Sequence, residues 1–387
     1  MRGKNERIFR GGVQLDTVSP NSNANQKRNL GIDALRIFSM FLVIILHIMG
    51  HGGISQNVTG AKFYIVSFLN VAACCAVDIY AIISGYVGYS DRVKPFKSEK
   101  FLKIWLQVAF YSFLITLCAF CFISDAVGIK ALIRSVFPIA SNQYWYFSSY
   151  AALIFLMPWI NRFIRALTNK ELTVFVTVLC CLFSVFMVFV CRLGAADPFL
   201  LGYGYSSIWL AVLYVFGAWA KRLDIPNKVR TKYAWIAIAF CVLISWLFKD
   251  VLEGFLKTGS LVGYTSPTIL LTAMSWLVIF AKMKPGKIIG KVINFFAPAA
   301  FGVYLIHDNN LVREYFVSRY FQWIANAPAL LIAFEIIGCA LGVLIVGLLI
   351  EKIRLTLFKV FGVNKLITEI GIKIDKAVQH AFDKIDV

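Results

Sequence analysis

The sequence predicts an all-α, polytopic integral membrane protein with about ten transmembrane helices. Of its 387 residues, 59% are hydrophobic and only 15% are charged, whereas roughly 45–50% of a soluble chain is apolar. The formal net charge is +19, but the basic residues lie in clusters between apolar segments, and a nucleic-acid-binding protein would carry them on a soluble body. We therefore infer that the basic residues gather on one side of a membrane protein. We expect no nucleic-acid partner.

Ten apolar segments are each close to the roughly 20 residues that cross the hydrocarbon core of a bilayer. Several are short for a spanning helix, so their boundaries are approximate. They cover residues 33–50, 64–88, 101–124, 145–161, 172–191, 206–220, 233–248, 263–281, 295–311 and 328–350.

The distribution of basic residues predicts that both chain termini are cytoplasmic. With the N-terminus inside, the cytoplasmic segments hold 30 of the 39 Lys and Arg residues, the outer loops hold eight, and Arg36 lies within the first segment. This asymmetry follows the positive-inside rule. We expect a polar cytoplasmic tail over 1–31, a transmembrane region over 32–351, and a cytoplasmic tail over 352–387 that forms an amphipathic helix on anionic lipid.

The nine cysteines predict neither a disulfide framework nor a metal site. Most lie within apolar runs with no histidine nearby, and the Cys118-x-x-Cys121 pair has no second pair to accompany it. Cysteines in such surroundings are typical small buried hydrophobes. We expect no metal in this protein.

Two ionisable residues of the first apolar segment, Arg36 and His47, are functional candidates, because ionisable residues are costly at membrane depth. Arg36 and His47 are separated by eleven residues, which advance a helix by three turns plus about 20° and by about 16.5 Å along its axis. The two side chains therefore share one face, with Arg36 near the cytoplasm and His47 deep in the membrane. His51 and Lys62 fall in the outer loop that follows, where we expect them to be solvated.

Three further ionisable residues fall at the depth of His47. Counted from the cytoplasmic end of each segment at about 1.5 Å per residue, all four lie roughly 20–24 Å into the membrane. They are His47, Asp78, His307 and Glu335. We infer that they meet in one polar chamber, although residue depth does not say which helices are neighbours.

Each of these residues also has a structural interpretation. His47 could be a packing residue that bonds a backbone carbonyl, and Asp78 could pair with a basic neighbour. His307, together with Asp308, could lie solvated at the interface. Glu335 could make a structural hydrogen bond.

Four motifs follow one another along the chain and cover most of it. They are Gly31-Ile-Asp-Ala-Leu-Arg36 with ten residues before His47, Ala76-Val-Asp-Ile-Tyr-Ala-Ile-Ile-Ser-Gly-Tyr86, Gln143-Tyr-Trp-Tyr-Phe147 leading to Leu156-Met-Pro158, and Gly302-Val-Tyr-Leu-Ile-His307. This set resembles the motifs of the acyltransferase-3 family of integral membrane acyltransferases. Many members carry Arg-x-x-Arg before the third helix, where this chain has Lys100 and Lys103, which keep the charge but lose the bidentate geometry of arginine.

The resemblance implies a membrane-bound O-acyltransferase. Such an enzyme takes an acyl group, usually acetyl, from cytoplasmic acyl-CoA and delivers it to a hydroxyl of a cell-surface or lipid-linked glycan, such as an exopolysaccharide unit. The expected partners are therefore acetyl-CoA as co-substrate, the glycan acceptor and the lipid bilayer of a bacterial cytoplasmic membrane. The identity of the acceptor, the acyl group and a homo-oligomeric state stay open.

The resemblance also implies a binding site for the cofactor at the cytoplasmic face. Arg36, Lys100 and Lys103 are expected to hold the phosphates of CoA through charge-assisted hydrogen bonds, and Ser84 is expected to line the path. The pantetheine arm is long enough to cover a distance like that between Arg36 and His47. The thioester could then reach His47 while the nucleotide stays inside.

His47 is the leading catalytic residue on this interpretation. It would act as general base on the acceptor hydroxyl or as a nucleophile that forms an acyl-imidazole. Asp78 would orient its ring, and His307 would donate to the thioester oxygen or contact the acceptor. The remaining candidates, for the acceptor site, are Tyr86, Trp145, Tyr304 and Glu335.

Two alternatives come from other functional classes. A secondary transporter or flippase for a polar solute would use buried His, Asp and Glu residues as a proton relay and would consume no acyl-CoA. An inactive relative would serve as a scaffold for a glycan assembly complex. Thioester hydrolysis or acyl transfer by the purified protein separates both from the enzyme.

Overall fold

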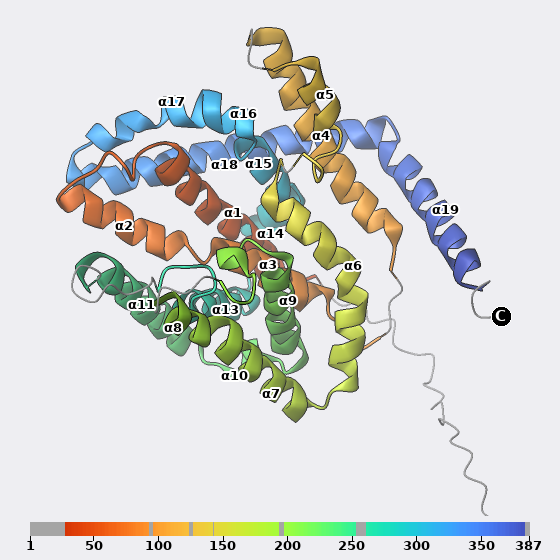
Figure 1. Ribbon diagram of the computed structural model, residues 1–387, viewed down its shortest axis with the longest axis horizontal. Coiled ribbons are helices and arrows are strands. Elements are labelled where there is room, and N and C mark those ends of the chain that lie inside the picture. Colours follow the sequence, from red (N-terminus) through yellow and green to blue (C-terminus); the bar gives the residue numbers. More distant parts are fainter. Residues whose placement is uncertain are drawn as a thin grey trace, which may run out of the picture.

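The computed structural model describes residues 28–92, 96–123, 127–141, 143–192, 197–252 and 261–383, which form helices and connections with no strand among them (Figure 1). Eight helical segments within these ranges are long and apolar enough to cross a membrane. The all-α polytopic fold class is confirmed, whereas most of the predicted tail over 1–31 lies outside the described residues. The eight are α1 (Leu30–His51), α2 with α3 (Ala61–Ala73 and Ala76–Gly88), α4 (Ser98–Phe122), α6 (Trp145–Ala166), α7 with η1 and α8 (Asn169–Cys180, Cys181–Val185 and Phe186–Arg192), α11 with η3 (Thr231–Leu247 and Phe248–Leu252), α14 with η4 and α15 (Lys287–Phe296, Ala297–Ala299 and Ala300–His307), and α18 (Ala329–Val360).

All ten predicted segments are helical, but two are shorter than a spanning helix. The segments 206–220 and 263–281 form α9 (Ser207–Arg222) and α13 (Pro267–Ala281), with 16 and 15 residues. At about 1.5 Å per residue they are no longer than about 24 Å. The short connecting elements are α5 (Ile129–Ser135), η2 (Gly202–Gly204), α10 (Ile225–Lys228), α16 (Asn310–Val312), η5 (Arg313–Val317), α17 (Ser318–Tyr320) and η6 (Gln322–Asn326).

The most extensive contact between two helices of the described residues joins α3 to α9. A β-carbon on Gly85 would lie 1.9 Å from the carbonyl oxygen of Tyr214, and one on Gly217 would lie 2.0 Å from that of Ile82. Small residues of this kind let two membrane helices approach closely. The Ser-Gly-Tyr part of the second motif therefore has a packing role at Gly85.

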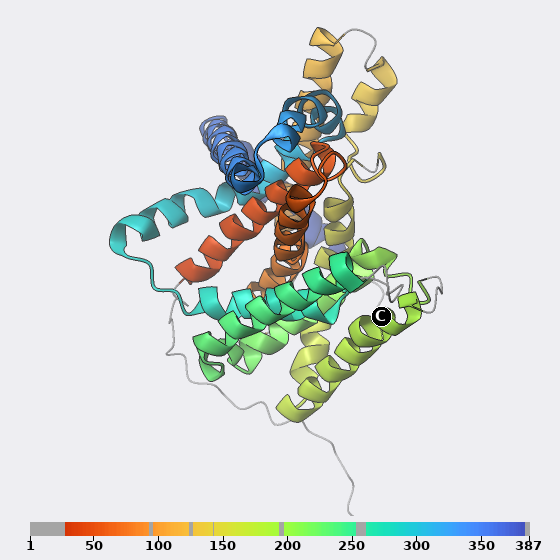
Figure 2. The same ribbon diagram turned by 90° about the vertical axis from the view of Figure 1, so that its left-hand side faces the viewer.

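The helix α1 lies in the middle of the molecule, against α3, α13, α15 and α18 (Figure 1). Asn29 starts it, because its side-chain oxygen accepts hydrogen bonds from the backbone amides of Gly31 and Ile32. A second view shows that α1 is steeply inclined to the layer formed by α11 and α13 (Figure 2). This position lets one face of α1 line an interior pocket.

The last spanning helix does not end at the predicted boundary between residues 351 and 352. The helix α18 continues to Val360, and Glu351 and Arg354 form a buried ion pair within it, with 2.5 Å between Oε1 and Nη2. Gln107 and Tyr111 of α4 also donate hydrogen bonds to Glu351. Because these partners satisfy the charges locally, the helix does not need to leave the protein core at Glu351.

The C-terminal helix α19 (Val363–Asp383) lies beside α4 at the right of Figure 1. The backbone amide of Ser98 donates to Asp375, and the hydroxyl of Thr368 donates to Glu99, over 3.0 and 2.9 Å. The predicted tail helix therefore packs on the first turn of α4. Its binding to a lipid surface stays a prediction.

The cysteines differ in part from their expected burial. The eight cysteines whose side chains the structure describes are free thiols, and Cys74, Cys75 and Cys241 are buried. In contrast, the prediction of burial is wrong for Cys118, Cys121 and Cys181, which are exposed. An apolar run does not distinguish a core position from the outer surface of a helix in lipid.

Candidate active site

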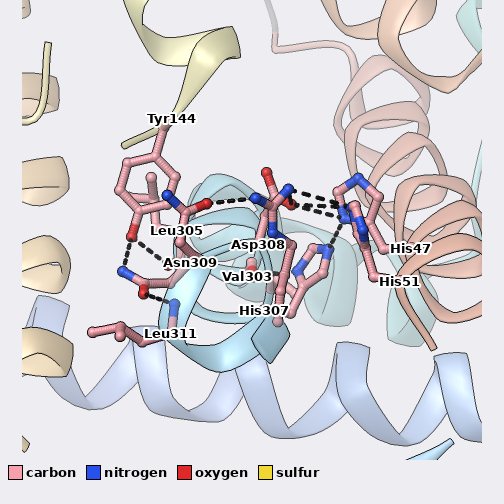
Figure 3. Close-up of polar contacts among 11 residues, drawn as sticks. His47, His51, Tyr144, Val303, Leu305, His307, Asp308, Asn309 and Leu311 are labelled. Atoms are coloured by element: carbon pink, nitrogen blue, oxygen red, sulfur yellow. Dashed lines mark hydrogen bonds and ion pairs between the residues drawn. The ribbon is translucent and has the colours of Figure 1, made fainter. Parts of the chain in front are cut away.

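A pair of histidines joins α1 to α15. The Nδ1 atom of His47 lies 2.9 Å from the Nε2 atom of His307, and the ring centroids are 5.0 Å apart (Figure 3). His307 is buried, and the side chain of His47 is 20% exposed. The structure thus brings together two of the four residues predicted at one depth.

The backbone fixes which nitrogen of each ring carries a proton. His307 Nδ1 lies 2.6 Å from the carbonyl oxygen of Val303, and a carbonyl can only accept, so Nδ1 is the donor. In the neutral pair, His307 Nε2 is then an acceptor for the Nδ1 proton of His47. The lone pair of His47 is therefore on Nε2, which is the nitrogen required of a base or a nucleophile.

This arrangement does not favour one of the two roles expected for His307, the donation of a hydrogen bond to the thioester oxygen. Its Nδ1 proton is used by Val303 and its Nε2 faces His47. The neutral ring has no second proton to donate to a thioester oxygen. His307 is instead placed to set the tautomer of His47.

Asp308 occupies the position that was predicted for Asp78. Its Oδ1 atom lies 3.4 Å from His47 Nδ1, and Asp308 is the one carboxylate of the described residues within 4.0 Å of His47. Asp78 instead accepts a hydrogen bond from Trp209 Nε1 at 3.2 Å, across the α3–α9 contact. A carboxylate beside His47 can stabilise the imidazolium that forms when the ring takes a proton.

Asp308 is also the centre of a small charged cluster. Arg313 Nη1 lies 3.4 Å from its Oδ1 atom and 3.3 Å from His51 Nε2, which lies 4.0 Å from the same carboxylate oxygen. Burial raises the pKa of Asp308, and the neighbouring His307 and Arg313 act in the opposite direction. His51, expected to be only solvated, is therefore part of the cluster (Figure 3).

Tyr144 and Asn309 hold the end of α15 in place. The Tyr144 hydroxyl donates to the carbonyl of Leu305 over 2.8 Å, and Asn309 Nδ2 donates to the Tyr144 oxygen over 2.9 Å. Asn309 also caps the next helix by accepting from the amide of Leu311. Neither residue is a candidate from the sequence alone. Asn309 does carry a signal, because asparagine is a preferred N-cap residue at the start of a helix.

A pocket of 540 Å³ lies on one side of His47. Along α1 it extends from Met40 to His51, about 16 Å at the rise of a helix. Met40 is one turn beyond Arg36, and Tyr203 at the pocket is 64% exposed. The lining therefore covers the face of α1 between His51 and Met40 and ends one helical turn short of Arg36.

Aromatic side chains form a large part of the pocket wall, and two of the predicted acceptor residues are among them. Trp145 and Tyr304 both line it, and the Trp145 ring lies 4.4 Å from that of Tyr205. The phenol oxygen of Tyr146, also at the pocket, is buried without a hydrogen-bond partner in the described residues. A buried orphan hydroxyl suits a ligand with a polar group.

Three other candidates lie away from this pocket. Ser84 Oγ donates to the backbone of Tyr80 and to the Tyr150 hydroxyl, and Tyr86 packs under Lys221 with 5.1 Å from Nζ to the ring centroid. Glu335 lies on α18 and is absent from the pocket lining. Of the four residues predicted to meet in one polar chamber, only His47 and His307 are in contact. Asp78 and Glu335 do not line the pocket.

Two of the three predicted phosphate-binding residues have ionic partners on their own elements. Arg36 Nη1 donates to Asp33 over 2.7 Å, and Lys103 Nζ donates to Glu99 over 2.5 Å. Lys100 is exposed at the start of α4. No hydrogen bond or ion pair of the described residues joins α1 to α4, so the structure does not unite these three cations in one site by direct contact.

One group of side chains has the composition of a metal site. His47, His51 and Asp308 offer ligand atoms that lie within 4.8 Å of one another. The guanidinium of Arg313 contacts two of the three residues. A cation at this position would have to compete with that positive charge.

The comparison with known proteins gives one match. A family model described as an acyltransferase domain, Acyl_transf_3, matches residues 29–351, which extend from the cap of α1 to the buried glutamate of α18. No curated protein and no solved structure matches the chain.

Proposed function

Because the chain belongs to the acyltransferase-3 family and is a membrane acyltransferase, we propose that it transfers an acyl group from cytoplasmic acyl-CoA to a hydroxyl of a cell-surface or lipid-linked glycan. One observation carries this proposal. Among the described residues no hydrogen bond uses His47 Nε2, and His47 lines a pocket that extends along α1 to Met40, one helical turn from Arg36, and includes exposed Tyr203.

The acyl transfer needs one base, and His47 fits that role. Its Nε2 atom accepts the proton of the acceptor hydroxyl as the hydroxyl oxygen attacks the thioester carbonyl carbon. A carbon–oxygen bond forms, the carbon–sulfur bond breaks, and the departing thiolate of CoA takes the proton. In the nucleophilic alternative, the same Nε2 atom first forms an acyl-imidazole, which the acceptor then attacks.

The groups behind His47 support its protonated state. When Nε2 takes the proton, the ring keeps its Nδ1 proton directed at His307 and close to Asp308. A neighbouring acceptor and a negative charge stabilise an imidazolium in a site shielded from water. His307 and Asp308 are therefore positioning residues for His47.

The donor enters from the side of Arg36 in this proposal. The phosphates of CoA stay with Arg36, and the smaller contributions of Lys100 and Lys103 come from the start of α4. The uncharged pantetheine arm follows the face of α1 from Met40 to His47, so no charge crosses the membrane. Acetyl-CoA is the donor that the family resemblance suggests.

The acceptor enters from the opposite end of the pocket. Trp145, Tyr203, Tyr205 and Tyr264 line that end. Aromatic side chains present a flat apolar face together with a polar edge, which suits a sugar ring with its hydroxyls. A glycan can thus lie across these rings with one hydroxyl directed toward His47.

The test compares surface glycans from cells with the protein, without it, and with His47→Ala. We expect mass spectrometry to find an ester-linked acyl group only with the wild-type protein, while the variant accumulates in the membrane normally. The loss of general-base catalysis alone would lower the rate by about 10²–10⁴-fold. Full acylation by His47→Ala, or solute transport without acyl-CoA consumption, would refute the proposed function.

A further inference from the structure

A second pocket lies on the other side of the histidine pair. It has a volume of 370 Å³ and lies between α1, α15, η5 and α18. His47 and His307 both line it. His47 therefore lines both the aromatic pocket and this one, which we call the rear pocket.

The rear pocket is almost free of polar groups. Apart from the two histidines, its walls are formed by glycines, one cysteine and hydrophobic side chains, among them Ile44, Ile48, Ile306, Val343, Val346 and Ile350. The amides of pantetheine or the hydroxyls of a sugar would lose hydrogen bonds there. An alkyl chain, in contrast, would gain the free energy of burial.

The position of the rear pocket identifies the alkyl chain that fits it. In the proposed reaction the acyl carbonyl lies beside His47, and the chain of the acyl group begins one bond from that carbon. The lipid anchor of a glycan is separated from the acylated hydroxyl by sugar and phosphate groups, which an apolar pocket excludes. We propose that the rear pocket receives the chain of the transferred acyl group, so that the enzyme prefers acyl groups longer than acetyl.

The packing of α15 on α18 gives the length of that chain. A β-carbon on Gly347 would lie 2.9 Å from a side-chain carbon of Val303. His307 is one turn further along α15, which places it level with Val343 of the antiparallel α18. Ile350 marks the far end of the pocket lining on α18. From Val343 to Ile350 the helix advances about 10 Å. An extended alkyl chain of about eight bonds, at roughly 1.2 Å per bond, covers that distance.

The test measures donor preference with the purified protein in lipid nanodiscs. Release of free CoA is followed with acetyl-, butyryl-, hexanoyl-, octanoyl- and dodecanoyl-CoA in the presence of glycan extracted from the cells that make the protein. We expect kcat/KM to rise by about fourfold per added methylene up to about eight carbons and no further. A flat series, or one in which acetyl-CoA is best, would overturn the inference.

This inference rests on the proposed function, and the two fail differently. If no donor gives CoA release that depends on His47, the proposed function itself is wrong. If release depends on His47 but not on chain length, only the acyl-chain assignment is wrong. A rear pocket filled by membrane lipid would give that second result.

A matched pair of variants tests the pocket directly. A side chain added at Gly342 of the rear pocket meets no atom within 4 Å at its β-carbon, and the same holds for Gly338, one turn earlier and outside the lining. Phenylalanine also has a higher helix propensity than glycine, which applies at both positions. We expect Gly342→Phe to lower the octanoyl to acetyl ratio of kcat/KM by at least about tenfold, whereas Gly338→Phe keeps it. An unchanged ratio in Gly342→Phe would refute the assignment.

Discussion

At the scale of single residues, His47 depends on neighbours that the sequence does not bring together. A helix has a fixed rise, so the separation of Arg36 and His47 and the depth of His307 follow from counting residues. Counting cannot say which carboxylate faces His47, because that depends on which helices are neighbours. Asp78 was therefore predicted for the place that Asp308 takes.

The two carboxylates allow a direct comparison by mutation. We expect Asp308→Asn to lower kcat by about tenfold or more, because it removes the negative charge that stabilises the His47 imidazolium. Asp78→Asn should cost less, because an asparagine can still accept the Trp209 hydrogen bond. Acyl transfer at saturating acyl-CoA measures both. A larger loss in Asp78→Asn would support the original assignment instead.

At the scale of helices, the apolar pattern predicts nearly all of the elements, but their ends less well. Each of the ten predicted segments is helical. The charges near residue 352 indicated the end of the last segment, but Glu351 and Arg354 form an ion pair inside α18. A pair at i and i+3 lies on one helix face, so it can remain buried where two unpaired charges could not.

Helix packing also gives opposite predictions for two glycines. Gly85→Ala should destabilise the protein by about 1–3 kcal/mol, since the new β-carbon would lie 1.9 Å from the Tyr214 carbonyl oxygen. Gly342→Ala should be neutral or stabilising by up to about 1 kcal/mol, because its β-carbon has open space. Thermal unfolding in detergent measures both. Equal melting temperatures would contradict the close α3–α9 contact.

At the scale of the whole molecule, α1 connects three regions of the proposed reaction path. Arg36 lies near one end, His47 faces both pockets, and His51 lies at the other end. The order of these residues follows from the sequence. The surrounding walls do not, because the pockets are formed by residues from α2 through α18 that meet only in the folded bundle.

The proposed path of acyl-CoA along α1 predicts a defined kinetic effect of replacing Arg36. If Arg36 binds a phosphate equally in the ground and transition states, Arg36→Ala raises the KM for acyl-CoA and leaves kcat nearly unchanged. Loss of one charge-assisted hydrogen bond corresponds to about 10–100-fold in KM. The matched control is Arg28→Ala, because Arg28 pairs with the same Asp33 over 2.5 Å and its loss perturbs that carboxylate in a similar way.

A truncated donor completes this test. Acyl-pantetheine carries the same thioester and arm but lacks the phosphates, so Arg36→Ala should leave its kcat/KM close to the wild-type value. The ratio of kcat/KM for acyl-CoA to that for acyl-pantetheine should then fall by about 10–100-fold in Arg36→Ala and stay constant in Arg28→Ala. An equal loss with both donors would mean that Arg36 supports the fold of α1 through Asp33, and the phosphates of CoA would have to bind elsewhere.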